Sequence, residues 1–149
     1  MVTGLGIALA EPASAGFKGC YERVYDAKYL RRHKGQHVIR IRLQIGVSQG
    51  DDGPFEFLDR IDAVLRKARR YDGNLISCEP MGEELSCGIE ADGGTFTVTD
   101  RGLDRGRQAI RISNDGYMNF GGDDASKTVE SDNENREFRL YRVSEGPCP

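Results

Sequence analysis

The chain has 149 residues, of which 38% are hydrophobic and 30% charged, and its formal net charge is −3. This length and composition predict one globular domain with a substantial core. No segment approaches the roughly 20 consecutive apolar residues of a transmembrane helix, which excludes a protein held in the membrane by one.

Residues 1–15 (MVTGLGIALAEPASA) differ in composition from the rest of the chain. An apolar run from Val2 to Ala10 precedes Ala13-Ser14-Ala15, the small-x-small pattern that signal peptidases recognise. We interpret the segment as a remnant of an export signal without its positively charged start; an ordinary flexible terminus is the alternative. The remaining residues, 16–149, are expected to form one disulfide-stapled β domain in the periplasm or outside the cell.

A short helix and a strand are predicted next. Asp26 is a favourable N-cap residue and Gly35 a favourable stop, so the residues between them are expected to be helical. Residues 38–47 (VIRIRLQIGV) alternate between apolar and polar side chains, which indicates a half-buried strand. Arg40 and Arg42 would then point away from the core.

Residues 55–71 fit two structures. A proline near the start, acidic residues early, basic residues late and apolar residues at helical spacing favour a helix. The same run also alternates Ile61, Ala63 and Leu65 as a strand would, with Asp72-Gly73 as the following hairpin turn. Both alternatives remain open at this point.

A hairpin that contains two of the four cysteines is predicted for residues 76–89. If the chain turns at residues 81–84, Cys78 lies directly opposite Cys87 and Ile76 opposite Ile89. Directly opposed residues of antiparallel strands have Cα atoms about 4.5 to 5.5 Å apart, which is close enough for a disulfide.

A second hairpin turn is predicted at Asp92-Gly93, a favoured two-residue loop. This turn would place Phe96 opposite Ile89 and Val98 opposite Cys87. The two hairpins together predict one meander with a single apolar face.

The last third of the chain predicts a hairpin, a loop and a strand. In the hairpin, a loop at residues 114–116 would pair Ile112 with Met118 and Ile110 with Phe120. The polar segment 121–135 is expected to be a long exposed loop. Residues 136–143 (REFRLYRV) predict a final strand, with Phe138 and Leu140 facing inward.

Structural disulfides are the expected role of the cysteines, because an exported chain with an even number of cysteines usually forms them. With Cys78 and Cys87 assigned to the hairpin, Cys20 and Cys148 are expected to form the second bridge. The spacings match neither a zinc site nor a redox pair.

Four short motifs, GCY, YLRRHKGQHVIRIRL, SCGIEADGG and REFRLYRV, together resemble those of a group of small exported bacterial proteins without assigned function. The group has the same cysteine hairpin followed by Asp-Gly-Gly, and a late Phe-Arg-Leu strand. The resemblance implies a more strand-like segment at 55–71, which removes the preference for a helix there. It implies no activity.

No set of residues predicts catalysis or a cofactor. His33 and His37 lie four apart without a third ligand nearby, and no serine lies in a Gly-x-Ser-x-Gly motif. The acidic pairs Glu83-Glu84 and Asp123-Asp124 are typical of solvated loops. A weak calcium candidate consists of four oxygen-bearing residues without EF-hand spacing. These are Asp123, Asp124, Glu130 and Asp132.

Charge is distributed unevenly along the chain. Residues 18–70 hold 13 Lys/Arg and 7 Asp/Glu, whereas residues 71–149 hold 8 and 16. Basic residues of the first part could form one anion-binding surface; the alternative is a solvated face that pairs with the acidic half. The candidates are Arg31, Arg32, Lys34, Arg40, Arg42, Arg66, Lys67, Arg69 and Arg70. No aromatic residues alternate with these arginines, which argues against nucleic acid as a partner of an exported protein.

Taken together, these patterns predict a mainly β fold, an antiparallel barrel or sandwich of about seven or eight strands with one or two short helices. The expected function is that of a non-catalytic periplasmic or secreted binding protein for an anionic envelope component or a protein. An inhibitor of an exported hydrolase, similar in architecture to disulfide-stapled lysozyme inhibitors, is one alternative. A carrier of a small lipophilic ligand is another.

Overall fold

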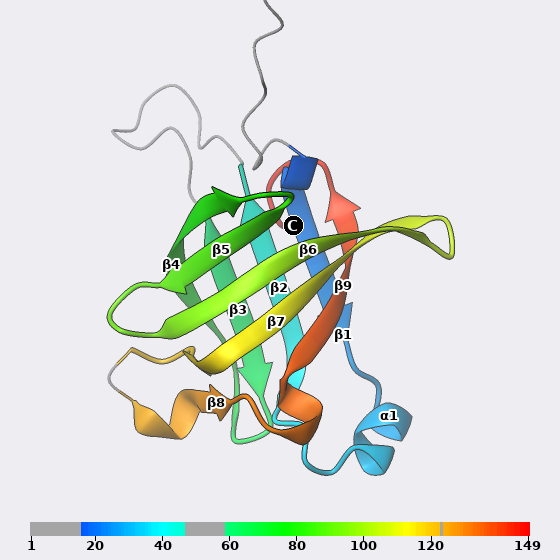
Figure 1. Cartoon of the computed structure of the whole chain (residues 1–149). Helices are drawn as coiled ribbons and strands as arrows, with labels where there is room; N and C mark the ends of the chain where they lie inside the picture. Colours follow the sequence, from blue (N-terminus) through cyan, green and yellow to red (C-terminus); the bar gives the residue numbers. More distant parts are fainter. Residues whose placement is uncertain (1–15, 47–58, 123) are drawn as a thin grey trace, which may run out of the picture.

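The described residues, 16–46, 59–122 and 124–149 of a computed structural model, form an eight-stranded antiparallel β-barrel with one extra strand (Figure 1). The predicted mainly β fold is thus confirmed, as a barrel. The strands are β1 (Gly19–Val24), β2 (Val38–Ile45), β3 (Arg60–Leu65), β4 (Ala68–Met81), β5 (Glu84–Ile89), β6 (Gly94–Asp104), β7 (Arg107–Asn119), β8 (Thr128–Glu130) and β9 (Glu137–Ser144). The interpreted export signal, residues 1–15, lies outside the described part of the chain.

The barrel is an up-and-down arrangement in which strands β1 to β7 pair with their sequence neighbours. Strand β9 lies between β7 and β1 and so closes the barrel, while β8 pairs with the C-terminal end of β7. One α-helix, α1 (Ala27–Arg32), joins β1 to β2, and its N-cap is Asp26, as predicted. Within the described ranges, no helix is long and apolar enough to cross a membrane.

Large apolar side chains fill the inside of the barrel. An eight-stranded barrel has an interior just wide enough for side chains to fill. Tyr21, Phe96, Phe120 and Phe138 are almost completely buried there. Inward-facing aliphatic residues of strands β2 to β7 and β9 pack with them. The predicted inward positions Phe138 and Leu140 of the last strand are confirmed.

The ambiguity at residues 55–71 is resolved for residues 60–65, which form β3. Ile61, Ala63 and Leu65 face the core, and the backbone pairs with β2 on one side and β4 on the other. The predicted turn at Asp72-Gly73 is wrong, because these residues lie within β4 opposite β3 and the chain turns near Arg66 instead. Strand pairing on both sides outweighs the local helical pattern. Residues 55–58 lie outside the described ranges.

The first hairpin has the predicted register, with Ile76 opposite Ile89 and Cys78 opposite Cys87. The second register is wrong by two residues, since Phe96 lies opposite Cys87 and not Ile89. The chain uses a longer turn, in which Ala91 and Asp92 have positive φ and the Gly93 N–H donates to the Ile89 carbonyl. A shift of two residues preserves the strand alternation, so the apolar face is the predicted one.

The hairpin predicted around residues 114–116 is wrong. Strand β7 continues through these residues, pairing with β6 on one side and with β9 and then β8 on the other. Asn114 is buried, and its side chain donates to the carbonyls of Val129 and Asn135. These long-range hydrogen bonds give the Asn114 side chain its partners while the backbone stays in a strand. A local sequence pattern cannot identify such distant partners.

The segment predicted as a long exposed loop, 121–135, is partly ordered and partly buried. It contains two short 3-10 turns, η2 (Ala125–Lys127) and η3 (Asn133–Asn135), on either side of β8. Val129 and Asn135 have no exposed surface. The loop prediction failed because one apolar side chain and one asparagine suffice to anchor a polar segment.

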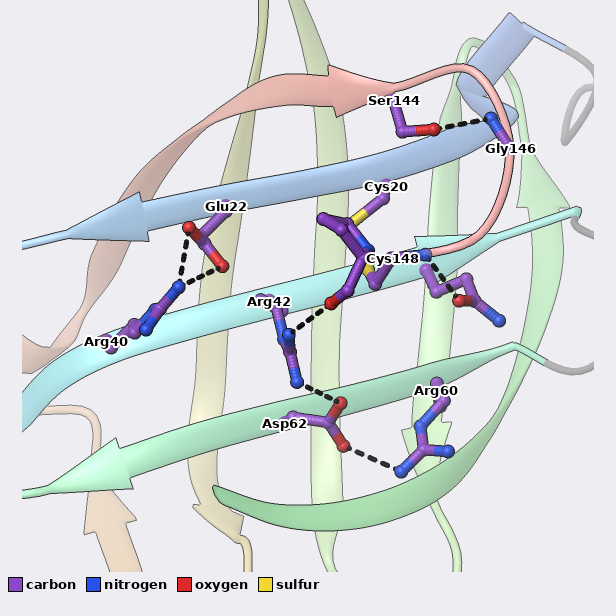
Figure 2. The surroundings of a disulfide bond; sticks show 11 residues. Cys20, Glu22, Arg40, Arg42, Arg60, Asp62, Ser144, Gly146 and Cys148 are labelled. Atoms are coloured by element: carbon purple, nitrogen blue, oxygen red, sulfur yellow. Dashed lines mark hydrogen bonds and ion pairs between the residues drawn. A yellow bond between two sulfur atoms is a disulfide. The ribbon is translucent and has the colours of Figure 1, made fainter. Parts of the chain in front are cut away.

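Two disulfides are present, with the predicted pairings Cys78–Cys87 and Cys20–Cys148. The second joins β1 to the tail that follows β9 across a sequence separation of 128. Figure 2 shows how this tail lies over the outside of β2. The Cys148 N–H donates to the Gln44 side chain, and Arg42 donates to the Pro149 carbonyl.

Candidate functional site

The arginines of β2 point outward, as predicted, but they are engaged by neighbouring strands. Arg40 donates two hydrogen bonds to Glu22, at 3.0 and 3.1 Å. Arg42 lies 3.7 Å from the carboxylate of Asp62, which also accepts from Arg60 (Figure 2). This face of the barrel is therefore a network of paired charges.

Arg66 has a structural position at the end of α1. Its guanidinium donates to the main-chain carbonyls of Leu30, His33 and Gln36, at 2.9, 3.1 and 2.6 Å. The last carbonyls of a helix have no partner within the helix. Arg66 supplies these partners and ties α1 to the turn between β3 and β4.

We expect Arg66→Gln to lower the free energy of unfolding by about 1 to 3 kcal/mol, because several carbonyls lose a charged donor. Urea denaturation would measure the change. Lys67→Gln is the matched control, since it removes the same charge from the exposed neighbouring position. Equal effects of the two substitutions would show that Arg66 has no special structural role.

The structure divides the other basic candidates among several places. Arg31 and Lys34 line a shallow groove with Arg66 beside α1, and Arg32 is exposed on the helix. Lys67 lines a different groove, next to β8. Arg69 and Arg70 belong to β4, and their side chains are not among those that the structure describes.

The metal candidates are not brought together in the described residues. Asp124 accepts hydrogen bonds from Ser126, whereas Glu130 and Asp132 line the groove next to β8, and Asp123 lies outside the described ranges. No group of three or more potential metal ligands occurs in the part of the chain that the structure describes.

The two histidines have separate surroundings. His33 is bonded to Glu134 at 3.1 Å, and His37 is exposed, with its main-chain N–H donating to Asn135. They do not form a shared site.

A cleft forms where β1 and β9 separate. The two strands pair over only three residue pairs, the last of which is Glu22 with Tyr141, although β9 begins further back at Glu137. Beyond that pair, β1 runs toward α1 and away from β9 (Figure 1). The resulting cleft has a volume of about 520 Å³. It is lined by Arg23, Tyr25, Tyr29, Arg101, Asp104, Arg105, Arg111, Glu137, Arg139 and Tyr141.

Arg23, one of the residues that line this arginine–tyrosine cleft, lies against three aromatic rings. Its guanidinium carbon is 4.8 Å from the ring centre of Tyr25, 5.9 Å from that of Tyr29 and 5.7 Å from that of Tyr141. Burial raises the pKa of Tyr25, so this phenol is neutral at physiological pH. The rings hold the guanidinium in place by cation–π contacts without neutralising its charge.

The second wall of the cleft is the arm, which we define as residues 100–108 at the tip of the β6–β7 hairpin. Figure 1 shows the arm projecting beyond the barrel. Arg105 and the flanking glycines Gly102 and Gly106 have positive φ, which builds the irregular tip. Asp104 and Arg107 lie opposite each other, and both contact Tyr141 of β9.

Asp104 fastens the arm to β9. Its Oδ2 atom accepts hydrogen bonds from the Tyr141 hydroxyl and the Arg139 guanidinium, both at 2.9 Å. The Tyr141 hydroxyl, together with Arg139, holds the pKa of Asp104 below its ordinary value. Asp104 is therefore ionised throughout the physiological range.

The cleft is strongly basic. Its lining contains five arginines and two acids, a formal net charge of +3. Arg139 pairs with Asp104, and Arg111 lies 3.8 Å from Glu137. Among the described residues, by contrast, no carboxylate lies within ion-pair distance of Arg23, Arg101 or Arg105. These guanidinium groups keep donors available for an external anion.

The cleft could not be predicted from local sequence patterns, because its residues come from positions 23–29, 101–111 and 137–141. Most of its arginines belong to the half of the chain in which acids predominate. The available signal was the outward-facing arginines at 111 and 139, which alternate with core residues of two neighbouring strands.

Comparison with known proteins does not identify a family for this chain. No protein-family model, curated protein or solved structure matches the chain significantly. The resemblance to small exported bacterial proteins therefore stays a prediction from the short motifs.

Proposed function

We propose that this protein is a non-catalytic binding protein that holds an anionic ligand in the arginine–tyrosine cleft. The observation that carries the proposal is the group Arg23, Arg101 and Arg105, three arginines without a carboxylate partner in the described residues, beside tyrosine rings. The ligand is anionic, as expected from the sequence, but the site is the cleft and not the predicted surface that includes Arg40 and Arg42.

The chemistry of the lining defines the kind of ligand. A guanidinium binds carboxylate or phosphate oxygens through two parallel N–H donors, and it is always charged. Tyrosine faces add flat contact surface at low cost in conformational entropy. The volume of about 520 Å³ is within the range of small-molecule sites. An acidic envelope component that presents several anionic groups fits this lining.

A periplasmic or secreted location supports this target. Two disulfides bridge the four cysteines, and such bridges persist in oxidising compartments. The export signal inferred from residues 1–15 is a second, sequence-based argument for the same location. Anionic envelope polymers would be accessible to the protein there.

Replacing these three cleft arginines, as Arg23→Gln/Arg101→Gln/Arg105→Gln, is expected to weaken binding of an anionic oligomer at least about tenfold, since each charged hydrogen bond contributes on the order of 1.5 to 3 kcal/mol. Isothermal titration calorimetry with oligogalacturonate and with inorganic polyphosphate would measure this, with neutral dextran as the blank. Binding should weaken with added salt.

The matched control is Arg31→Gln/Arg32→Gln/Lys34→Gln, which removes the same charge from α1 and the turn after it. We expect this variant to bind within about twofold of the parent, because its side chains lie outside the cleft. The proposal is wrong if the parent binds neither anion at low salt. It is also wrong if the two triple variants lose affinity equally, which would indicate a general effect of net charge.

The arm gives the inhibitor alternative a specific basis. Leu103 is 75% exposed on the projecting tip, next to arginines 101, 105 and 107. A projecting basic hairpin with an apolar residue is suited to an acidic cleft of another protein. Leu103→Ser, which leaves the charge of the arm unchanged, would abolish inhibition of such an enzyme and change binding of oligogalacturonate less than about twofold.

The carrier alternative receives no comparable support, because a lipophilic ligand would need an open apolar interior. The buried residues of the described barrel instead form one continuous cluster of large side chains.

A further inference from the structure

The carboxylate of Asp104 already occupies a two-donor position in the cleft. Arg139 Nη1 and the Tyr141 hydroxyl both donate to the same oxygen, at 2.9 Å. The donors come from β9 and the carboxylate from the arm, two elements that are separated in sequence but side by side at this point. The protein thus displays a carboxylate bound by the cleft's own arginine and tyrosine.

The attachment of Asp104 is weak enough to exchange. Arg139 is 45% exposed at its side chain and Asp104 is 27% exposed, so solvent screens their attraction. Exposed ion pairs change an equilibrium by no more than about fivefold. An external ligand that gains Arg23, Arg101 or Arg105 in addition could therefore displace Asp104.

We infer that the ligand of the cleft carries carboxylate groups, one of which replaces that of Asp104 on Arg139 and Tyr141, so that binding releases the arm from β9. This inference rests on the proposed function and specifies it. Asp104 acts as an internal competitor: it keeps the two donors satisfied and the arm fastened while the cleft is free. An acidic polysaccharide, with carboxylates repeated on successive sugar rings, is the ligand class that we expect.

Asp104→Asn is the first test. The amide keeps the size of the side chain but removes the charge that competes for Arg139, so oligogalacturonate should bind about three- to fivefold more tightly than to the parent. Glu137→Gln is the matched control, because it removes one negative charge from the same cleft at a residue that lies 3.8 Å from Arg111. This control should change the affinity less than about twofold.

The carboxyl groups themselves provide a second readout. In the free protein the pKa of Asp104 lies below its ordinary value because of its hydrogen bonds to Tyr141 and Arg139. Saturation with oligogalacturonate should raise the pKa of Asp104, followed by NMR of the labelled carboxyl carbon, because both donors are taken by the ligand.

The outcomes separate the two proposals. Absence of binding of both oligogalacturonate and polyphosphate to the parent overturns the proposed function and this inference with it. If polyphosphate binds more tightly than oligogalacturonate of equal charge, the ligand class is wrong. If oligogalacturonate binds but Asp104→Asn and Glu137→Gln have equal effects, or the pKa of Asp104 stays low in the complex, the exchange is wrong while the cleft remains a binding site.

Discussion

Replacing both cysteines of the Cys20–Cys148 bridge by alanine is expected to lower the free energy of unfolding by about 4 to 5 kcal/mol. The bridge connects residues 128 positions apart, so it restricts nearly the whole described chain in the unfolded state. Its loss would also free the tail that lies over β2, where Cys148 is bonded to Gln44. Urea denaturation of the variant and the parent would give the difference.

The Cys78–Cys87 bridge provides the comparison within the same protein. It closes a separation of only 9 residues, so the double alanine variant should lose about 2 to 3 kcal/mol. The stabilising effect of a disulfide grows with loop length in the chain-entropy model. A larger loss from the hairpin bridge than from Cys20–Cys148 would contradict that explanation for this barrel.

The second large effect is expected at Asn135, which has no exposed surface. Its side chain donates to the Gly35 carbonyl and to Asp132, and it accepts from the His37 main-chain N–H. Asn135→Ala would remove these three part-buried hydrogen bonds and leave a void where the buried amide side chain lies. We expect the free energy of unfolding to fall by about 2 to 4 kcal/mol.

The control for Asn135 is its exposed neighbour, Arg136→Ala, which should change stability by less than about 0.5 kcal/mol. Urea denaturation serves both variants. Hydrogen exchange of the His37 amide would show whether the loss occurs where the structure locates it. An unchanged His37 amide in Asn135→Ala would rule out this asparagine as the link between the two segments.

The features that could be predicted from the sequence are those that depend on short-range register. In the cysteine hairpin, the turn, the apolar pair Ile76 and Ile89, and the two cysteines all require the same pairing. Their agreement specified both the strands and the disulfide. The alternation in β2 was equally informative from Ile41 to Ile45, where the apolar residues are buried. At the start of the strand, where the register shifts, Val38 is buried and Ile39 only half-buried.

Local patterns failed where distant strands decide the conformation. The Asn-Asp-Gly run at 114–116 is typical of a turn, but pairing with β6 and bonds from Asn114 to Val129 and Asn135 hold it extended. Residues 60–65 are strand because β2 and β4 lie on either side. Neither set of partners can be identified from a local window.

The candidate site shows the same limit. The distribution of charge along the chain predicted an anion-binding surface that includes Arg40 and Arg42. In the structure these arginines pair with Glu22 and Asp62 on the neighbouring strands β1 and β3. The cleft arginines that have no carboxylate partner among the described residues lie mainly in the more acidic half. Proximity in the barrel, not abundance in the sequence, determines which guanidinium groups remain available.

The connection between the first and last barrel strands also has a mechanical consequence. A force that pulls residues 20 and 148 apart would be carried by the covalent sulfur–sulfur bond and not by the few hydrogen bonds between β1 and β9. The barrel therefore cannot be unzipped from its two ends while the bridge is intact. Under tension, the oxidised protein should extend only by the residues outside the bridge, whereas the reduced protein should open strand by strand from β1 and β9.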